Sequence, residues 1–249
     1  MIDIPRIFTI SESEHRIHNP FTPEKYATLG RALRMAPGTA ILDLGSGSGE
    51  MLCSWARDHQ IVGTGVDMSL LFSQQATARA EALGVSDRVT FVHQDASGYV
   101  ASQPCDIAAC VGATWIGGGV AGTIALLKQS LTPGGMLLIG EPWWRKRPAT
   151  AEEAVACGAQ TPDDFLTLPA LVAHFGELGY DVVEMVLADQ EGWDRYEAAK
   201  WLTMRRWLEA NPHDHFAPEV RQQLTTAPLH HVTWTREYLG WGVFVLMAR

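Results

Sequence analysis

The chain has 249 residues, a formal net charge of −9 and 47% hydrophobic residues. A chain of this length can bury a substantial core, which favours one α/β domain with insertions over two separate domains. The negative charge argues against a nucleic-acid partner, although a local basic patch would be enough to bind nucleic acid. No apolar run approaches the length of 18 residues that a membrane-spanning helix needs.

The N-terminal segment (residues 1–36) is predicted to contain one helix after an irregular stretch. Residues 1–21 show no helical or strand periodicity. Thr22 then offers an N-cap, followed by a proline in the first turn, which predicts a helix that runs to about Met35. His18 lies in the irregular stretch, where it is either a general base or an ordinary surface residue.

A buried strand followed by a glycine-rich turn is the most informative feature of the sequence. Residues 41–49 are Ile-Leu-Asp-Leu-Gly-Ser-Gly-Ser-Gly. Glycines lack a Cβ, so the backbone amides of such a turn can approach a ligand closely, and the helix predicted over residues 50–59 points its N-terminus at the same ligand. The pattern predicts a nucleotide-type site in the cofactor-binding core (residues 37–188), to which it contributes Asp43, Gly45, Ser46, Gly47 and Gly49.

The spacing of this turn and the acid before it distinguish between nucleotides. In a dinucleotide-binding fingerprint the third glycine falls where this chain has Glu50, a poor neighbour for a pyrophosphate. A strand buried on both faces is normally apolar, so Asp43 requires a partner, and a ligand ammonium would supply one where a phosphate would not. An NAD-dependent oxidoreductase is therefore disfavoured but remains an alternative.

Two further predicted strands also end in acids. The strand over residues 61–67 ends in Asp67, at a distance from the glycine turn that suits a carboxylate accepting both ribose hydroxyls. The strand over residues 88–95 ends in Asp95, where an exocyclic adenine amine could bind. Each acid alone could instead be a surface residue or a helix N-cap. Acids at three successive strand ends together indicate one shared site.

The first half of the chain continues this alternation of strand and helix. A helix over residues 69–83, a fourth strand over residues 106–111, a helix ending at Leu131 and a fifth strand over residues 136–140 are predicted. The alternation predicts a right-handed, doubly wound and mainly parallel sheet, in which ligands bind beyond the carboxyl ends of the strands. The residues expected beside the site for this reason are Gly112, Trp115, Glu141 and Trp143.

The second half of the chain does not continue the regular alternation of strand and helix. One helix is predicted to start at Thr161 and another to run over residues 169–179, before a sixth strand over residues 181–187. Residues 189–239 are predicted to form a helical insertion rich in aromatic side chains, which either packs on the body of the protein or forms a lid over the acceptor pocket. A closing strand over residues 240–249 completes a predicted seven-stranded sheet.

These motifs resemble those of class I S-adenosylmethionine-dependent methyltransferases, over roughly residues 25–188 and the last strand. The matching residues are the run from Asp43 to Gly49, then Asp67, Asp95 with Ala96, and Pro133-Gly134-Gly135. The resemblance implies a Rossmann-like fold with an antiparallel last strand, and S-adenosylmethionine as the cofactor, with the glycine turn against its methionine part. The further cofactor-binding residues that it implies are Asp67 on the ribose, Asp95 and Ala96 at adenine, Gly112 near the sulfonium, and Met68.

The motifs specify the cofactor and the fold but hardly the methyl acceptor. A small molecule is expected as the acceptor. In-line displacement requires an aligned acceptor and the exclusion of water, and it requires a base only where the acceptor must lose a proton. Glu141 is either that base or a structural hydrogen-bond acceptor, and Trp115 is either an apolar wall or a cation-attracting ring. The candidate bases are Glu141 and His18, and the candidate substrate contacts are Trp115, Trp143, Trp193 and Tyr196.

Other functions and properties remain open at this stage. A protein that binds the cofactor without catalysis is the main alternative, because the three acids support binding in either case. Four cysteines without metal-ligand spacing, and the pair His213 and His215 without a third ligand in view, predict no metal site. The cysteine usage and the lack of a secretory leader predict a reduced, cytoplasmic protein without a membrane partner. The sequence does not specify an oligomeric state.

Overall fold

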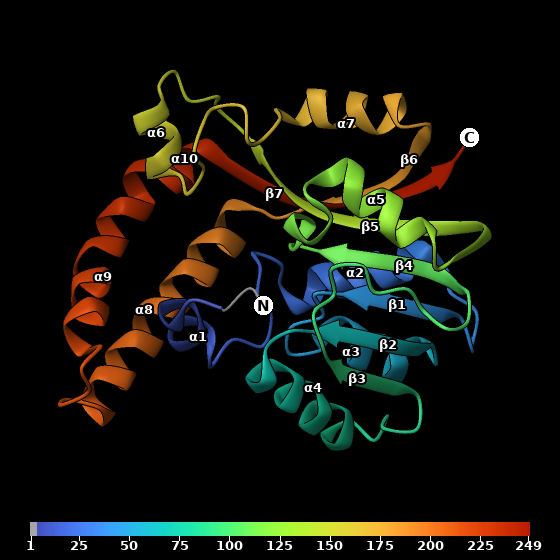
Figure 1. Cartoon of the computed structure of the whole chain (residues 1–249), viewed down its shortest axis with the longest axis horizontal. Helices are drawn as coiled ribbons and strands as arrows, with labels where there is room; N and C mark the ends of the chain where they lie inside the picture. The colour runs from blue at the N-terminus through green and yellow to red at the C-terminus, as the bar shows by residue number, and fades with distance from the viewer. Residues whose placement is uncertain (1–3) are drawn as a thin grey trace.

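A seven-stranded sheet with helices on both faces forms the centre of the structure, a computed structural model that describes residues 4–249 (Figure 1). The strand order is β3-β2-β1-β4-β5-β7-β6; β1 to β5 pair in parallel, and β7 runs antiparallel to both of its neighbours. This topology confirms the predicted doubly wound sheet with an antiparallel last strand. The strands are β1 (Ala40–Leu44), β2 (Val62–Asp67), β3 (Val89–His93), β4 (Cys105–Val111), β5 (Leu131–Trp144), β6 (Tyr180–Leu187) and β7 (Leu239–Ala248).

Helices cover the sheet because its central strands are apolar on both faces. Ile41 of β1 packs into a core cluster that contains residues of α2 and α3, whereas its neighbour Leu42 packs into one that contains residues of α5 and α7. Successive side chains of a strand point to opposite faces, so a parallel sheet of this kind needs a layer of helices on each. The helices are α1 (Arg6–Glu12), α2 (Pro23–Leu33), α3 (Glu50–His59), α4 (Leu70–Ala82), α5 (Val120–Lys128), α6 (Ala151–Ala156), α7 (Leu168–Glu177), α8 (Gln190–Ala210), α9 (Ala217–His230) and α10 (Arg236–Tyr238), with short helical turns η1 (Thr114–Gly117) and η2 (His231–Thr235).

Several helices begin where capping signals occur in the sequence. Thr22 caps α2 by accepting a hydrogen bond from the amide of Lys25, and Ser69 caps α4 by accepting one from the amide of Phe72. Helix α3 spans Glu50–His59, which is the predicted range. The groups that define these helices lie within a few residues of one another, which is why the sequence predicts them.

The N-terminal segment contains a helix where an irregular stretch was predicted. Helix α1 covers Arg6–Glu12, while residues 1–3 of the predicted stretch lie outside the described residues. Ile10 of α1 is buried and packs with Met204 and Leu208 of α8. Tertiary packing, and not local propensity, supplies most of the stability of so short a helix. The contact lies about 200 residues away along the chain, so local periodicity does not reveal it.

The stretch that begins at Thr161 is a turn where a helix was predicted. The hydroxyl of Thr161 donates a hydrogen bond to Oδ1 of Asp164 at 2.7 Å. Oδ2 of the same carboxylate accepts a hydrogen bond from the amide of Gln160 at 2.6 Å. The acid therefore closes the turn instead of supporting a first helical turn. Helix α6 lies just before this turn and is capped by Thr150.

The fifth strand is longer than predicted. It was expected over residues 136–140 but spans Leu131–Trp144, so the preceding helix α5 ends at Lys128 and not at Leu131 as predicted. The strand continues to Trp144 because its last residues pair antiparallel with the first residues of β7. Glu141 and Trp143 therefore lie within β5 and not in a loop after it. The cause is a pairing with a segment about 100 residues later in the chain, which the local sequence does not show.

The insertion forms a long helical pair beside the sheet. Figure 1 shows α8 and α9 side by side, with α1 lying against α8. This arrangement confirms the predicted helical character of the insertion. Within residues 4–249, no helix is both long and apolar enough to span a membrane.

Candidate active site

The main candidate cavity lies at the carboxyl ends of β1, β2 and β4. The sheet order places the first and fourth strands side by side, and an open α/β sheet binds ligands at such a reversal of strand order. The cavity has a volume of about 330 Å³. The predicted site residues that line it are His18, Gly45, Gly47, Asp67, Met68, Ala96, Gly112 and Trp115.

The glycine-rich turn contributes part of the cavity wall in a conformation that favours glycine. Gly45 and Gly47 have φ angles of 79° and 53°. A Cβ on Gly45 would lie 2.7 Å from the Cβ of Ala113, and a Cβ on Gly47 would lie 2.6 Å from Cδ2 of His18. Side chains at these two positions would therefore displace neighbouring parts of the wall.

Asp67 is the last residue of β2 and lines the cavity in a fixed orientation. Its Oδ2 accepts a hydrogen bond from the amide of Gly47 at 2.8 Å, and its Oδ1 accepts one from the amide of Ser69 at 2.8 Å. Each carboxylate oxygen has two lone pairs, so both oxygens retain the capacity to accept another hydrogen bond. The arrangement is chemically suited to a diol, such as the two hydroxyls of a ribose.

Asp43 is a buried carboxyl group that makes no side-chain hydrogen bond or ion pair with the described residues. It lies within β1 and, together with Ser46, lines a second cavity of about 30 Å³. Its Oδ1 and the Oγ of Ser46 are buried without a hydrogen-bond partner among residues 4–249. Burial, with a smaller contribution from the charge of Asp67, raises the pKa of Asp43 from 3.8 to about 7. Two orphaned polar atoms at one place indicate a site that a polar ligand completes, and a cationic group would favour the charged form of Asp43.

The remaining predicted cofactor residues differ in position, and among the described residues Asp95, the third acid of the predicted shared site, is not part of the cavity lining. Asp95 follows β3 by two residues and is exposed, and its Oδ1 accepts the amide of Ser97 at 2.8 Å. Ala96 is buried and lines the cavity. Gly49 caps α3 with a φ of 72°, and a Cβ there would lie 2.6 Å from Cζ of Phe91. In the described part of the chain, Asp95 and Gly49 line neither of the two cavities.

Glu141 lies in β5, next to an element of the cavity wall. Its Oε2 accepts a hydrogen bond from Oγ1 of Thr114 at 2.6 Å. Thr114 begins η1, which contributes Trp115 to the cavity. Burial raises the pKa of Glu141 to about 7, against the opposing effect of the hydrogen bond from Thr114. Among the described residues Glu141 is not part of the cavity lining, so it reaches the cavity through η1.

The four predicted substrate contacts occupy different surroundings. Trp115 lines the cavity and is 52% exposed. Trp143 packs on Gly240 of β7, and Trp193 is buried in the core cluster with α2 and α3. Tyr196 donates its hydroxyl hydrogen to a buried carboxylate of the N-terminal segment. For residues 4–249, only Trp115 of these four lines the main cavity, and the other three contribute to packing or to a hydrogen-bond network.

Sequence reasoning missed several apolar residues of the cavity wall. Pro5 and Phe8 of the N-terminal segment line it, as does Phe72 of α4, whose ring centroid lies 4.1 Å from that of His18. Phe72 lies five residues after Asp67, in the first turn of the next helix, so its position could have been predicted. Phe8 could not, because the helix that carries it was not predicted.

The fold and the site together define a class of protein. A doubly wound sheet with an antiparallel seventh strand, a glycine turn beside a buried unpartnered acid, and a second acid at the end of β2 are typical of the Rossmann-like methyltransferase fold.

Comparison with known proteins identifies the family. Residues 41–135 match a family described as methyltransferase domain. The uncharacterized protein YjhP of Escherichia coli K12 is 74% identical over 248 residues, and the match covers 100% of both chains. Methyltransferases from Geobacter sulfurreducens and Thiobacillus denitrificans, each crystallised with S-adenosyl-L-homocysteine, are 71% and 69% identical, with TM-scores of 0.98 and 0.97 over 100% of both chains. The chain belongs to the S-adenosylmethionine-dependent methyltransferases.

We expect Asp43→Asn to stabilise the protein in the absence of ligands. The pKa of Asp43 is raised from 3.8 to about 7 by folding, so ionisation of this group favours unfolding, at a cost that grows from about pH 4 to about pH 7. Asparagine keeps the shape without the charge. The variant should therefore gain about 2–4 kcal/mol in free energy of unfolding at about pH 8 and almost none at about pH 4. Urea denaturation at the two pH values measures the gain, and equal stability of both proteins at the higher pH would contradict the expectation.

Proposed function

We propose that this methyltransferase transfers the methyl group of S-adenosylmethionine to a small-molecule acceptor by in-line displacement. The observation that carries the proposal is the unpartnered carboxyl group of Asp43 beside the glycine turn, which the ammonium of the cofactor's methionine part would complete. The Geobacter and Thiobacillus relatives, crystallised with S-adenosyl-L-homocysteine, support the same cofactor. The bound cofactor supplies a methyl group that its sulfonium already activates, which leaves positioning to the protein.

The proposed cofactor contacts run along the carboxyl edge of the sheet. The glycine turn would hold the methionine part, and the end of β2 would hold the ribose. The segment after β3 would hold the adenine, and the segment after β4 would border the sulfonium. The residues with these proposed roles are Asp43, Gly45, Ser46, Gly47 and Gly49 in the turn, Asp67 and Met68 at the ribose, Asp95 and Ala96 at the adenine, and Gly112 near the sulfonium.

The character of the cavity wall supports a small acceptor. Among the described residues that line it, Asp67 and His18 are the side chains that can carry charge, and neither lysine nor arginine contributes. Together with the net charge of −9, this composition disfavours a nucleic-acid backbone as partner. Phe8, Phe72 and Trp115 would exclude water from the reacting groups, which favours alignment of the acceptor for attack.

Glu141 favours catalysis over mere binding of the cofactor. A general base works best when its pKa lies near the working pH, and the pKa of Glu141 is raised to about 7. We therefore propose Glu141 as the group that receives a proton from the acceptor, directly or through Thr114. The four buried cysteines, all free, support a reducing cytoplasmic location for this chemistry.

Label transfer tests the proposed function. Purified protein is incubated with S-adenosylmethionine labelled in its methyl group and with fractions of a small-molecule extract, and mass spectrometry follows the label. Label in a small molecule is the expected result. Tight binding of S-adenosyl-L-homocysteine without transfer to any fraction would favour the non-catalytic alternative. Calorimetric binding of NAD in place of S-adenosyl-L-homocysteine would favour the oxidoreductase.

Asp67→Ala is expected to weaken the binding of S-adenosyl-L-homocysteine by at least about tenfold, because it removes a charged acceptor of two hydroxyls. Isothermal titration calorimetry measures the dissociation constant. Asp181→Ala is the matched control, because Asp181 lies on the remote edge strand β6 in an exposed ion pair with Arg249. An unchanged dissociation constant for Asp67→Ala would refute its proposed role at the ribose.

Glu141→Gln is expected to lower turnover by at least about tenfold while changing the affinity for S-adenosyl-L-homocysteine by less than about twofold. The wild-type rate should rise with pH through about 7, since the base must be ionised, and this rise should be absent in the variant. Thr114→Val separates the two routes, because it removes the hydrogen bond and leaves the carboxyl group in place. It should lower turnover as well if the proton passes through Thr114, and should leave turnover largely unchanged if Glu141 takes the proton directly. Equal losses of turnover and affinity in Glu141→Gln would place Glu141 among the structural residues.

A further inference from the structure

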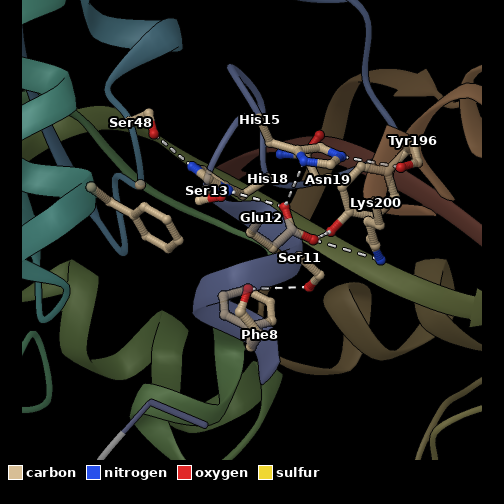
Figure 2. Close-up of polar contacts among 12 residues, drawn as sticks. Phe8, Ser11, Glu12, Ser13, His15, His18, Asn19, Ser48, Tyr196 and Lys200 are labelled. Carbon is tan, nitrogen blue, oxygen red and sulfur yellow. Dashed lines mark hydrogen bonds and ion pairs between the residues drawn. The ribbon is translucent and has the colours of Figure 1, made fainter. Parts of the chain in front are cut away.

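A buried carboxylate at the end of α1 is the centre of a hydrogen-bond network that joins three distant segments. Figure 2 shows Glu12 between His18 on one side and Tyr196 and Lys200 of α8 on the other. Its Oε1 accepts the hydroxyl of Tyr196 at 2.7 Å and lies 3.6 Å from Nζ of Lys200, while its Oε2 lies 3.1 Å from Nδ1 of His18. The second ring nitrogen of His18, Nε2, lies 2.7 Å from Oγ of Ser48 in the glycine turn.

The positions of the hydrogens in this network can be assigned by starting from Gln75, which contacts Ser48. The side-chain amide of Gln75 donates from Nε2 to the carbonyl oxygen of Ser13 at 2.7 Å, so its Oε1 is the atom that faces Ser48. An amide oxygen only accepts, so the single hydroxyl hydrogen of Ser48 points to Gln75, at 2.7 Å. Ser48 must then accept from His18, which places a hydrogen on Nε2 of the ring.

The other ring nitrogen of His18 also carries a hydrogen. Glu12 is 0% exposed, and burial alone would raise its pKa. The hydrogen bond with His18 and neighbouring charges, foremost that of Lys200, outweigh that effect, and the pKa of Glu12 is lowered. An ionised carboxylate only accepts hydrogen bonds, so Nδ1 of His18 donates to it. Hydrogens on both nitrogens would make His18 an imidazolium, with no free nitrogen with which to take a proton from an acceptor.

We infer that Glu12 is a positioning residue of the cofactor cavity, which holds His18 as an imidazolium with its ring against the glycine turn. His18 therefore fixes the turn and the wall instead of serving as the general base predicted from the sequence. The inference rests on the proposed assignment of this cavity to the cofactor.

The same network fixes the outer wall of the cavity. Glu12 is the last residue of α1, and Pro5 and Phe8 at the start of this helix line the cavity. Tyr196 and Lys200 connect the end of α1 to α8, and Ile10 of α1 also packs on α8. Loss of the charge on Glu12 should therefore loosen two contacts of the N-terminal segment with the cavity. One is the contact of His18 with the glycine turn, and the other is the part of the wall that Pro5 and Phe8 form.

Nuclear magnetic resonance of protein with ¹⁵N-labelled histidine tests the state of His18 directly. At about pH 7.5 a histidine free in water is mostly neutral, whereas His18 should show two protonated ring nitrogens in the ligand-free wild type. The signals are assigned by their loss in His18→Asn. A neutral His18 ring in the wild-type protein would overturn the inference, and this measurement does not depend on the folding of any Glu12 variant.

Glu12→Gln tests the consequence for the cavity. The variant should convert His18 to the neutral ring, weaken the binding of S-adenosyl-L-homocysteine by about tenfold and raise its dissociation rate. Tryptophan fluorescence can report that rate, and loss of the signal change in Trp115→Phe assigns it to the Trp115 that lines the cavity. Glu14→Gln is the matched control, because Glu14 lies two residues away and also pairs with α8, through Arg206, but on the exposed surface. The control should leave the His18 signals and the affinity unchanged.

The outcomes separate the two proposals. Unchanged His18 signals and unchanged affinity in a folded Glu12→Gln variant would overturn the role of Glu12. Failure of the wild-type protein to bind S-adenosyl-L-homocysteine would contradict the cofactor assignment instead, and the ring state of His18, measured without ligand, would still decide the inference.

Discussion

A carboxylate removed from water is costly unless cations or hydrogen-bond donors meet it, and this constraint organises the cavity. The buried acids in the described part of the chain are Glu12, Asp43, Glu50 and Glu141. Glu12 and Glu50 lie beside cationic side chains of the same chain, and both connect the N-terminal segment to the rest of the structure. Within residues 4–249, Asp43 and Glu141 form no ion pair with such a cation, and the pKa of each is raised to about 7. The paired acids thus hold the site together, and the unpaired acids are available for a ligand or a proton.

Glu50 illustrates how one position serves both fold and specificity. It takes the place of the third glycine of a dinucleotide fingerprint, where a pyrophosphate would meet its charge. In the structure its carboxylate accepts hydrogen bonds from Arg79 of α4 and from Arg16 of the N-terminal segment. The residue that departs from the fingerprint therefore holds the segment that carries His18 against the rest of the structure.

Sequence reasoning succeeded where the decisive groups lie close together in the chain. The range of α3, the cap of α2 and the approximate start of α4 follow from residues within one or two helical turns. The doubly wound, mainly parallel character of the sheet follows from the alternation of strands and helices, and with it the position of Asp67 at the cavity. These features needed only the local pattern and the handedness of the crossover connections.

The failures share a different cause. Helix α1 is stabilised by packing on α8, and the end of β5 is extended by pairing with β7, so both depend on segments far away in the chain. Glu12 gives no sign of its role in the sequence, because Tyr196 lies 184 residues further along. Trp143 and Trp193 are aromatic residues near the expected site, but aromatic side chains also serve as core, and only the three-dimensional structure separates the two uses.

The network around Glu12 also bears on the two interpretations of the insertion, as packing or as a lid. Tyr196 and Lys200 of α8 do not line the main cavity in the described residues, yet both contact the carboxylate that ends the cavity-lining helix α1. The insertion can therefore influence the cavity without covering it, by fixing the segment that forms the wall. A movement of α8 would be transmitted to Phe8 and to His18 together, because one buried charge links them and cannot remain without partners in the interior.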